Sequence, residues 1–384
     1  MKNMKHIFSV LLSVMLLVCL AMPSLAEGRI EVSEIQKYGN LVLQISGSEL
    51  LAQGYDFGDI VTVNILGTDY DMPVGSNYSD VDQGSMICRV VIREDSGEDH
   101  VILAVNMGDL ATTAGIAIKE QTEEDPGYVW HLNAGVEAPV GVTISMKEKG
   151  GYYDSFVMHQ LVRSENREDY PDLTDEQFAN FRMVTTTGVG EGKLYRSSSP
   201  VNPGIARSTQ ADAAARNAGV KTFINLADNE EVMKDYEGFS ESYYSQQAVI
   251  PLNLGVDFAA EDFRMGLADG IRFIAKNEAP YLVHCNEGKD RAGFVSAVLE
   301  CLMGADAGEV TEDYMVTYYN YYGVQPGTEQ YGIVAASNIR KSLAAAFGLE
   351  SIEGADLSKE AEEYLHKIGV SEEDIAAVRA NLSK

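Results

Sequence analysis

Short apolar runs separated by turns rich in Gly, Asp and Asn recur through residues 27–162. Runs of this kind are typical of β-strands. The clearest predicted strands are residues 41–45, 60–65, 87–92 and 101–105. Residues 142–146 and 156–158 flank a Lys-Glu-Lys-Gly-Gly turn, and we interpret them as a closing hairpin. We therefore expect an all-β domain in this part of the chain.

After residue 178 the pattern changes to alternating strands and helices. The predicted strands are residues 222–226, residues 249–252 and a run that begins at Tyr281. Between the last two, apolar residues recur at helical spacing, at Phe263, Leu267, Ile271 and Ile274. This alternation predicts an α/β domain over residues 178–384, with a mostly parallel sheet flanked by helices and further helices at the C-terminus. Residues 163–177 are polar and acidic, which predicts a linker between the two domains.

The first 26 residues have the composition of a secretory signal peptide. Lys2 and Lys5 precede an apolar stretch over residues 7–20, and small residues lead to a predicted cleavage site after Ala26. The apolar stretch is too short for a comfortable transmembrane span, so we expect no stable membrane insertion. The mature protein is therefore expected to be secreted or otherwise extracytoplasmic.

The formal net charge of −29 limits the partners that the protein can attract. An acidic surface repels nucleic acid and anionic lipid, so we expect neither as a partner. The same repulsion disfavours a polyanionic substrate such as an inositol polyphosphate. A phosphorylated peptide or a small phosphate ester is the expected substrate class.

The cysteines and histidines indicate neither a disulfide framework nor a metal site. Cleavage of the signal peptide would leave Cys88, Cys285 and Cys301, an odd number without paired spacing. The histidines show no metal-ligand spacing, so we expect no metal and no cofactor. His284 is interpreted as a buried residue that orients its neighbours.

Residues 281–293 carry the most specific chemical signal in the chain. An apolar run ends at Cys285, five residues follow, and Arg291 then precedes an amphipathic helix. Five residues can curl the backbone into a cradle of N–H groups around one phosphate, at the positive end of that helix. We expect a thiolate nucleophile at Cys285 and a two-oxygen grip by Arg291. The predicted phosphate-binding residues are Asn286, Glu287, Gly288, Lys289, Asp290 and Arg291.

Residues 178–340 resemble the bacterial atypical tyrosine phosphatases, whose loop reads HCxxGKDRTG. The matching segments are Asn180-Phe181-Arg182, Leu194-Tyr195-Arg196-Ser197, Ile224-Asn225-Leu226 and HCNEGKDRAG. The resemblance implies a protein-tyrosine phosphatase that works through a thiophosphoryl-cysteine intermediate. Some members of that family also act on phosphoserine and phosphoinositides, so a phosphoinositide phosphatase or phytase-like activity is an alternative.

The chain departs from this family at the residue after the arginine. Ala292 stands where a hydroxyl residue usually helps to stabilise the departing thiolate. We therefore expect slower turnover of the intermediate, and a phospho-ligand-binding protein without efficient catalysis is a further alternative. Ala227 and Asn225 also replace charged residues of the family, at the expected rim of the site.

Three carboxylates are candidates for the general acid that protonates the leaving oxygen. The resemblance implies Asp290, whose pKa a bound phosphate would raise by like-charge repulsion. Asp228 follows a predicted strand, although it could equally be the N-cap of a helix, and Asp257 is the third candidate.

A stripe of tyrosines follows the loop and its helix. Tyr314, Tyr318 and Tyr322 share one helical face, which is typical of packing. Stacking of this stripe on a phosphotyrosine ring is the alternative interpretation.

The N-terminal domain resembles the C-terminal β-barrel domain of S-adenosylmethionine hydrolases and halogenases. The matching residues are Tyr38-Gly39-Asn40-Leu41, Phe57-Gly58-Asp59, Met72-Pro73, Tyr78-Ser79-Asp80-Val81 and Ala104-Val105-Asn106-Met107-Gly108. In that family the barrel completes a nucleoside site together with another domain, which this chain lacks. The resemblance therefore implies a barrel kept as a binding or spacer module, with an unknown ligand as a possible partner.

Overall fold

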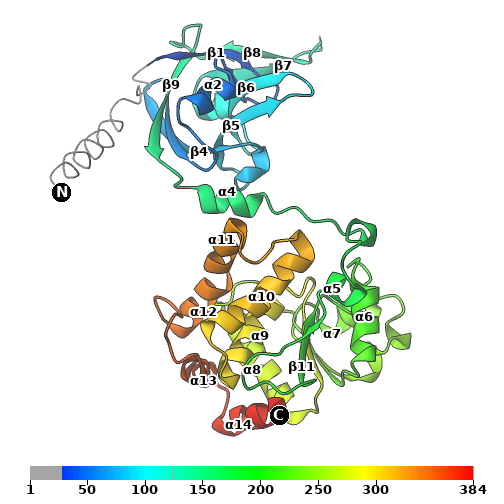
Figure 1. Ribbon diagram of the computed structural model, residues 1–384. Helices are drawn as coiled ribbons and strands as arrows, with labels where there is room; N and C mark the ends of the chain where they lie inside the picture. Colours follow the sequence, from blue (N-terminus) through cyan, green and yellow to red (C-terminus); the bar gives the residue numbers. More distant parts are fainter. Residues whose placement is uncertain (1–27, 124, 384) are drawn as a thin grey trace, which may run out of the picture. The chain divides into compact units, whose positions relative to one another are not determined.

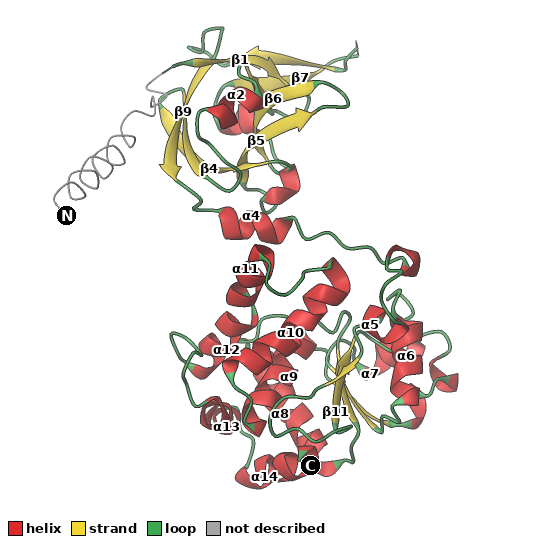
Figure 2. Cartoon of the chain, in the orientation of Figure 1, coloured by secondary structure: helices red, strands yellow, loops and turns green. Residues whose placement is uncertain are grey.

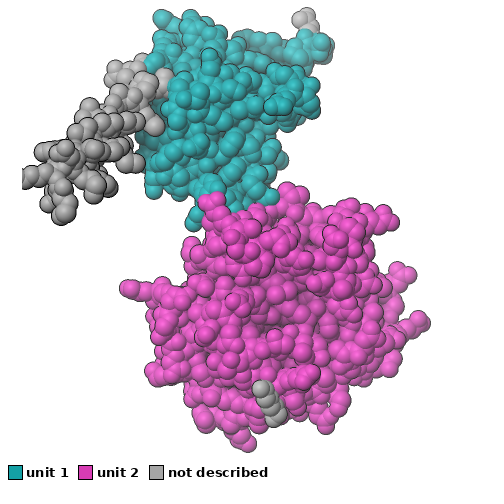
Figure 3. Space-filling view, viewed as in Figure 1, with its two compact units in different colours: residues 1–160 teal, residues 161–384 magenta. Residues whose placement is uncertain are grey.

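The computed structural model describes residues 28–123 and 125–383. The chain divides into two compact units between Gln160 and Leu161, which Figure 3 shows in different colours. The predicted signal peptide lies outside the described residues. Among the described helices, none is long and apolar enough to cross a membrane.

The first unit is a closed barrel in which seven described strands follow the order β1-β2-β6-β5-β4-β3-β9 (Figure 1). The barrel strands are β1 (Ile30–Ile35), β2 (Leu41–Leu43), β3 (Ile60–Ile65), β4 (Thr68–Gly75), β5 (Met86–Arg93), β6 (Glu98–Val105) and β9 (Gly141–Glu148). A separate pair consists of β7 (Ala117–Gln121) and β8 (Tyr128–Leu132). The short helices are α2 (Gly47–Ala52), η1 (Tyr78–Asp80), α3 (Leu110–Thr113) and α4 (Tyr153–His159).

Strict alternation along β3 shows why these residues form a barrel. Val61, Val63 and Ile65 are fully buried, and the residues between them are partly exposed. Because successive side chains of a strand point to opposite faces, every second residue enters the barrel core. The prediction of an all-β, barrel-like first domain is confirmed.

The predicted closing hairpin is wrong at its second strand. Residues 156–158 lie in helix α4. The reason is that β9 already pairs with β1 on one edge and with β3 on the other. The barrel is therefore closed before residue 156, and no free edge of β9 remains for a further strand.

The second unit contains a five-stranded sheet in the order β10-β11-β14-β12-β13. Its strands are β10 (Arg182–Met183), β11 (Leu194–Ser197), β12 (Thr222–Asn225), β13 (Ala248–Pro251) and β14 (Tyr281–His284). All neighbours run parallel except β10, which pairs antiparallel with β11 at one edge. The predicted α/β class with a mostly parallel sheet is confirmed.

Helices cover both faces of this sheet, as Figure 2 shows. Phe223 of β12 packs with α6, while a Cβ on Gly270 of α8 would lie 3.5 Å from the side chain of Ile224. Adjacent residues of one strand therefore face different helices. The helices are η2 (Arg167–Asp169), α5 (Asp175–Phe178), α6 (Ser208–Asn217), α7 (Glu230–Asp235), η3 (Phe239–Glu241), η4 (Tyr244–Gln246), α8 (Glu261–Lys276), α9 (Asp290–Met303), α10 (Ala307–Tyr322), α11 (Glu329–Ser337), α12 (Ile339–Phe347), α13 (Leu357–Lys367) and α14 (Glu372–Leu382).

The central strand of the sheet positions the Cys-x5-Arg segment. All four residues of β14 are buried, and the strand lies between β11 and β12. Ligands of open α/β sheets bind beyond the carboxyl ends of the strands, and residues 285–291 begin at that end of β14.

Residues 163–177, which we predicted as a linker, lie within the second unit and contain η2 and α5. The Tyr170 hydroxyl donates a hydrogen bond to the Tyr321 carbonyl at 2.9 Å, and the Ser164 carbonyl accepts one from the Arg207 guanidinium at 3.1 Å. The polar composition of this segment supplies hydrogen bonds that attach it to the α/β fold, so composition alone did not reveal its place.

Candidate active site

Residues 285–291 form a tight loop between β14 and α9. Cys285 directly follows the strand and is 3% exposed, and α9 begins at Asp290. Gly288 has a φ of +70°, and a Cβ at this position would lie 2.3 Å from the Ser197 carbonyl oxygen. Only glycine adopts this backbone conformation at such close approach without strain.

The carbonyl groups of the loop are held from outside. The Asn286 carbonyl accepts a hydrogen bond from the Ser199 backbone N–H at 3.0 Å. The Glu287 carbonyl accepts one from the Asn180 amide at 3.1 Å and one from the Tyr321 hydroxyl at 2.9 Å. Successive carbonyls that point outward leave the intervening N–H groups facing the inside of the loop, which is the arrangement of an anion-binding nest.

Arg196 anchors the next carbonyl from beneath the loop. This arginine is fully buried and donates to the Gly288 carbonyl at 2.9 Å. Its guanidinium also pairs with Asp313 of α10 at 2.7 Å, and Asp313 pairs with Arg182 at 2.9 Å. Burial acts to raise the pKa of Asp313, but the two guanidiniums outweigh it and hold that pKa below its ordinary value. The network therefore fixes the loop with an ionised carboxylate.

Glu300 of α9 lies close enough to this network to interact electrostatically with Asp313 and with both arginines. Its carboxyl group is fully buried, and neither of its oxygens has a hydrogen-bond partner among the described residues. Burial, and then the negative charge of Asp313, raise the pKa of Glu300 well above its ordinary value. The surroundings of Glu300 therefore favour its protonated form more than water does.

Arg291 is oriented by two backbone carbonyls. Its Nη1 donates to the Leu254 carbonyl at 2.9 Å and to the Leu226 carbonyl at 3.3 Å. Both acceptors lie beyond the carboxyl ends of strands in the sheet, Leu226 after β12 and Leu254 after β13. Within the described chain, Nη1 is the only nitrogen of this guanidinium with a hydrogen-bond acceptor, so the rest of the planar fork can bind an oxyanion.

Asp290 is the candidate acid that belongs to the loop itself. Its carboxyl group is 45% exposed and lies 3.8 Å from the ammonium of Lys289. Burial raises the pKa of Asp290, and the neighbouring Glu287 carboxylate adds to the shift. A raised pKa keeps a proton available nearer to neutral pH, as a general acid requires.

Asp228 accepts hydrogen bonds at both carboxylate oxygens. The Asn225 amide donates to Oδ2 at 3.0 Å, and the Tyr236 hydroxyl donates to Oδ1 at 2.7 Å. Both oxygens of Asp228 are therefore engaged by donors from its own surroundings. The alternative interpretation as a helix N-cap is wrong, because Asn229 caps α7 through the Val232 N–H at 2.8 Å.

Asp257, the third candidate, faces a different cavity from the one at the loop. It lies in the loop between β13 and α8 and accepts a hydrogen bond from the Ala259 N–H at 3.0 Å. No residue of 285–291 lines the cavity to which Asp257 contributes. Asp290 belongs to the Cys-x5-Arg segment itself, whereas the hydrogen bond of Asp257 is made within its own loop.

The rim of the loop carries charge and aromatic rings that sequence reasoning did not connect. Arg163 binds both carboxylate oxygens of Glu287, at 2.7 and 2.8 Å. Lys289 contacts the Tyr322 hydroxyl at 3.3 Å. Arg163 and Tyr322 also line a cavity of about 470 Å³, together with Tyr170, Tyr319 and Tyr321. An aromatic cavity therefore adjoins the loop.

The tyrosine stripe of α10 has two roles. Tyr314 and Tyr318 are buried, as expected for packing, whereas Tyr322 is partly exposed at the rim. The packing interpretation thus holds for the first two tyrosines.

His284 is fully buried, and its Nε2 lies 2.9 Å from the Tyr244 hydroxyl. Burial lowers the pKa of His284 to about 4, so the ring is neutral at neutral pH. Its expected role as a buried orienting residue fits this position.

All three described cysteines are free. Burial raises the pKa of Cys88 to about 12 and also raises that of Cys301, which makes both thiols poor nucleophiles. Cys285 is the cysteine that lies at an anion-binding loop.

Two family models match parts of the chain. The model of the tyrosine phosphatase family matches residues 176–384. The model of the SAM hydroxide adenosyltransferase C-terminal domain matches residues 30–123. No curated protein matches the chain.

Two solved structures are similar over parts of the chain. An uncharacterized conserved protein from Thermotoga maritima is 21% identical over 30% of this chain, with a TM-score of 0.22. The chain spans 35% of the length of that protein. The core catalytic domain of the PP-IP phosphatase SIW14 from S. cerevisiae, in complex with citrate, is 18% identical over 45% of this chain and 95% of that domain, with a TM-score of 0.28.

Proposed function

We propose that this chain, which belongs to the tyrosine phosphatase family, hydrolyses phosphate monoesters through the thiolate of Cys285. The observation that carries the proposal is the loop whose carbonyls are turned outward, above a buried cysteine and at the start of α9. Inward N–H groups and a helix N-terminus stabilise both a bound phosphate and a thiolate.

The reaction proceeds in two displacements. The Cys285 thiolate attacks phosphorus in line, the bond from phosphorus to the ester oxygen breaks, and Asp290 gives its proton to that oxygen. The amides of residues 286–291 and the Arg291 fork stabilise the charge on the remaining oxygens. A water molecule then attacks the thiophosphoryl intermediate, Asp290 takes a proton from it, and Cys285 leaves as a thiolate.

Phosphotyrosine, in a peptide or a small ester, is the proposed substrate, and its tyrosine phenol is the leaving group. The cavity beside the loop supports this substrate, because the partly exposed Tyr319 and Tyr322 line it and Tyr322 contacts Lys289. The net charge of −29 disfavours inositol polyphosphates. A phosphoinositide or phytase-like activity is therefore the weaker alternative.

Ala292 favours a second candidate function. The residue is fully buried in the first turn of α9, where it offers no hydroxyl to the departing thiolate. If the thiophosphoryl intermediate does not turn over, the domain would act as a phospho-ligand-binding protein.

Hydrolysis of p-nitrophenyl phosphate under reducing conditions tests the proposal. The mature protein should be active, and Cys285→Ser should lose activity while still binding vanadate. Cys301→Ser is the matched control, because it removes a buried thiol from the same domain without touching the loop. Activity that persists in Cys285→Ser would contradict the mechanism.

Rapid-quench trapping separates the two candidate functions. A radiolabelled phosphoryl group that accumulates on Cys285 and leaves slowly supports an enzyme limited by its second step. A protein that binds vanadate but never forms the adduct would be a binding protein.

We also propose that the protein is exported. The charged start and apolar stretch of residues 1–26 support this. N-terminal sequencing of protein recovered outside the cytoplasm should begin at Glu27, and an intact Met1 on that protein would contradict a cleaved signal peptide.

A further inference from the structure

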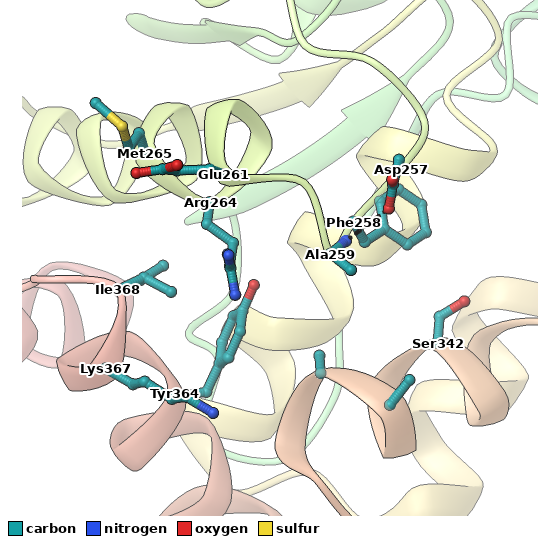
Figure 4. A pocket seen from close by; sticks show the side chains of 12 residues that line it. Asp257, Phe258, Ala259, Glu261, Arg264, Met265, Ser342, Tyr364, Lys367 and Ile368 are labelled. Carbon is teal, nitrogen blue, oxygen red and sulfur yellow. Dashed lines mark hydrogen bonds between the residues drawn. The ribbon is translucent and has the colours of Figure 1, made fainter.

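A cavity of about 600 Å³ lies in the second unit between α8, α12 and α13 (Figure 4). Its volume is in the range of pockets that hold small organic ligands. Neither the loop of residues 285–291 nor any residue of the rim lines this cavity. The lining residues are Asp257, Phe258, Ala259, Glu261, Arg264, Met265, Ser342, Ala345, Ala346, Tyr364, Lys367 and Ile368.

Tyr364 carries an unpartnered polar atom at this cavity. The residue is 5% exposed, and its hydroxyl has no hydrogen-bond partner among the described residues. A buried hydroxyl without a partner costs roughly 1–3 kcal/mol, so native structures rarely contain one without a reason. In Figure 4 the hydroxyl points into the cavity, toward the guanidinium of Arg264.

Arg264 of α8 is the second unpartnered group. Nine other arginines in the described part of the second unit pair with a carboxylate, and Arg291 donates to backbone carbonyls. The side chain of Arg264 has neither a hydrogen bond nor an ion pair within the described chain, and it interacts electrostatically with Tyr364. A half-buried guanidinium in so acidic a protein normally finds a carboxylate.

We propose that this cavity binds an organic monocarboxylate with an apolar body. The carboxylate would accept hydrogen bonds from the Arg264 fork and the Tyr364 hydroxyl, which satisfies both groups. Phe258, Ala345 and Ala346 provide apolar contacts for the body of the ligand. Asp257 and Glu261 line the same cavity, and their charges repel a phosphate dianion more strongly than a monoanion.

Residues of this cavity pack on α9, the helix whose first turn contains Arg291. The Phe258 ring stacks on Phe294 of α9, with centroids 4.4 Å apart, and Tyr364 meets the same ring edge-on at 6.4 Å. Phe258 also lies four residues after Leu254, whose carbonyl accepts from Arg291. A ligand that contacts Phe258 would therefore contact a residue that packs on α9 and belongs to the segment that holds Arg291.

Equilibrium dialysis of the mature protein against radiolabelled phenylacetate tests the proposal. The wild type should bind one equivalent saturably, and Arg264→Gln and Tyr364→Phe should each weaken binding by roughly 10-fold, since each removes one polar contact to a charged group. Arg216→Gln is the matched control, because Arg216 is exposed on α6, pairs with Asp212 and does not line the cavity. Its affinity should equal that of the wild type.

Two further measurements keep the test decisive. Arg291→Met should bind phenylacetate normally, and loss of binding there would place the probe in the catalytic loop and overturn the proposal. Tyr364→Phe should melt no lower than the wild type, because the hydroxyl that it removes has no partner in the protein. Absence of saturable binding by the wild type, or unchanged binding by Arg264→Gln or Tyr364→Phe, would also overturn it.

Discussion

Replacement of Gly288 by alanine tests whether the backbone shape of the loop of residues 285–291 determines the rate of phosphate ester hydrolysis. The φ of +70° costs a residue with a Cβ roughly 1–2 kcal/mol. The new Cβ would also lie 2.3 Å from the Ser197 carbonyl oxygen, whereas ordinary contact begins at 3.4 Å. The loop must therefore move by about 1 Å, and a displacement of that size at reacting groups costs on the order of 100-fold in rate.

The assay is steady-state hydrolysis of p-nitrophenyl phosphate beside thermal unfolding. Gly219→Ala is the matched control, because Gly219 has a φ of +65° and open space where a Cβ would lie. Gly219→Ala should lower the free energy of unfolding by a similar amount, because its backbone conformation is also strained for alanine, and it should keep the wild-type kcat. If Gly288→Ala keeps its kcat within about twofold of the control, the argument that the backbone cradle carries catalysis is refuted.

Three other changes give distinct results. Arg196→Met should lower kcat and the melting temperature together, because breaking a buried pair costs about 3–5 kcal/mol and frees the Gly288 carbonyl. Ala292→Ser should raise the rate at which the thiophosphoryl intermediate decays by roughly 10-fold, measured after rapid-quench trapping, if a hydroxyl assists the departing thiolate. Glu300→Gln should raise the melting temperature at neutral pH. The unfolded chain releases the Glu300 proton above a pH of about 4.5, whereas the raised pKa lets the folded state keep it to higher pH. The free energy of unfolding of the wild type therefore falls by up to about 1.4 kcal/mol per pH unit as pH rises.

Each of these predictions has an opposing outcome. A stable but inactive Arg196→Met would separate catalysis from the buried pair and contradict the coupled loss. An unchanged decay rate in Ala292→Ser, with the fold intact by near-ultraviolet circular dichroism, would show that the missing hydroxyl is not limiting. A Glu300→Gln protein whose melting temperature follows the wild-type pH profile would show that Glu300 is ionised in the fold.

The sequence predicted correctly the features that depend on residues close together in the chain. The strands of both domains are visible as apolar runs, and the loop could be read from the spacing of Cys285, Gly288 and Arg291, because these residues act within one turn of backbone. The start of α9 and the burial of His284 also follow from that short segment.

What the sequence could not predict depends on contacts between distant residues. Arg163 looked like part of a polar linker, yet it binds Glu287 from 124 positions away. Arg196 was visible in a family motif, but its hold on the Gly288 carbonyl appears only when β11 is placed beside β14. Residues 156–158 looked like a strand because their apolar character does not record that β9 already has two neighbours.

The outward-facing carbonyls of the loop have a consequence for synthesis of the chain. The groups that hold them come from Asn180, Arg196, Ser199 and Tyr321, so the last anchor is made more than thirty residues after Cys285. During translation Cys285 therefore emerges before the segment that supplies this last anchor. It gains its anion-binding surroundings only when α10 docks, and a bound oxyanion would then stabilise the finished domain by mass action.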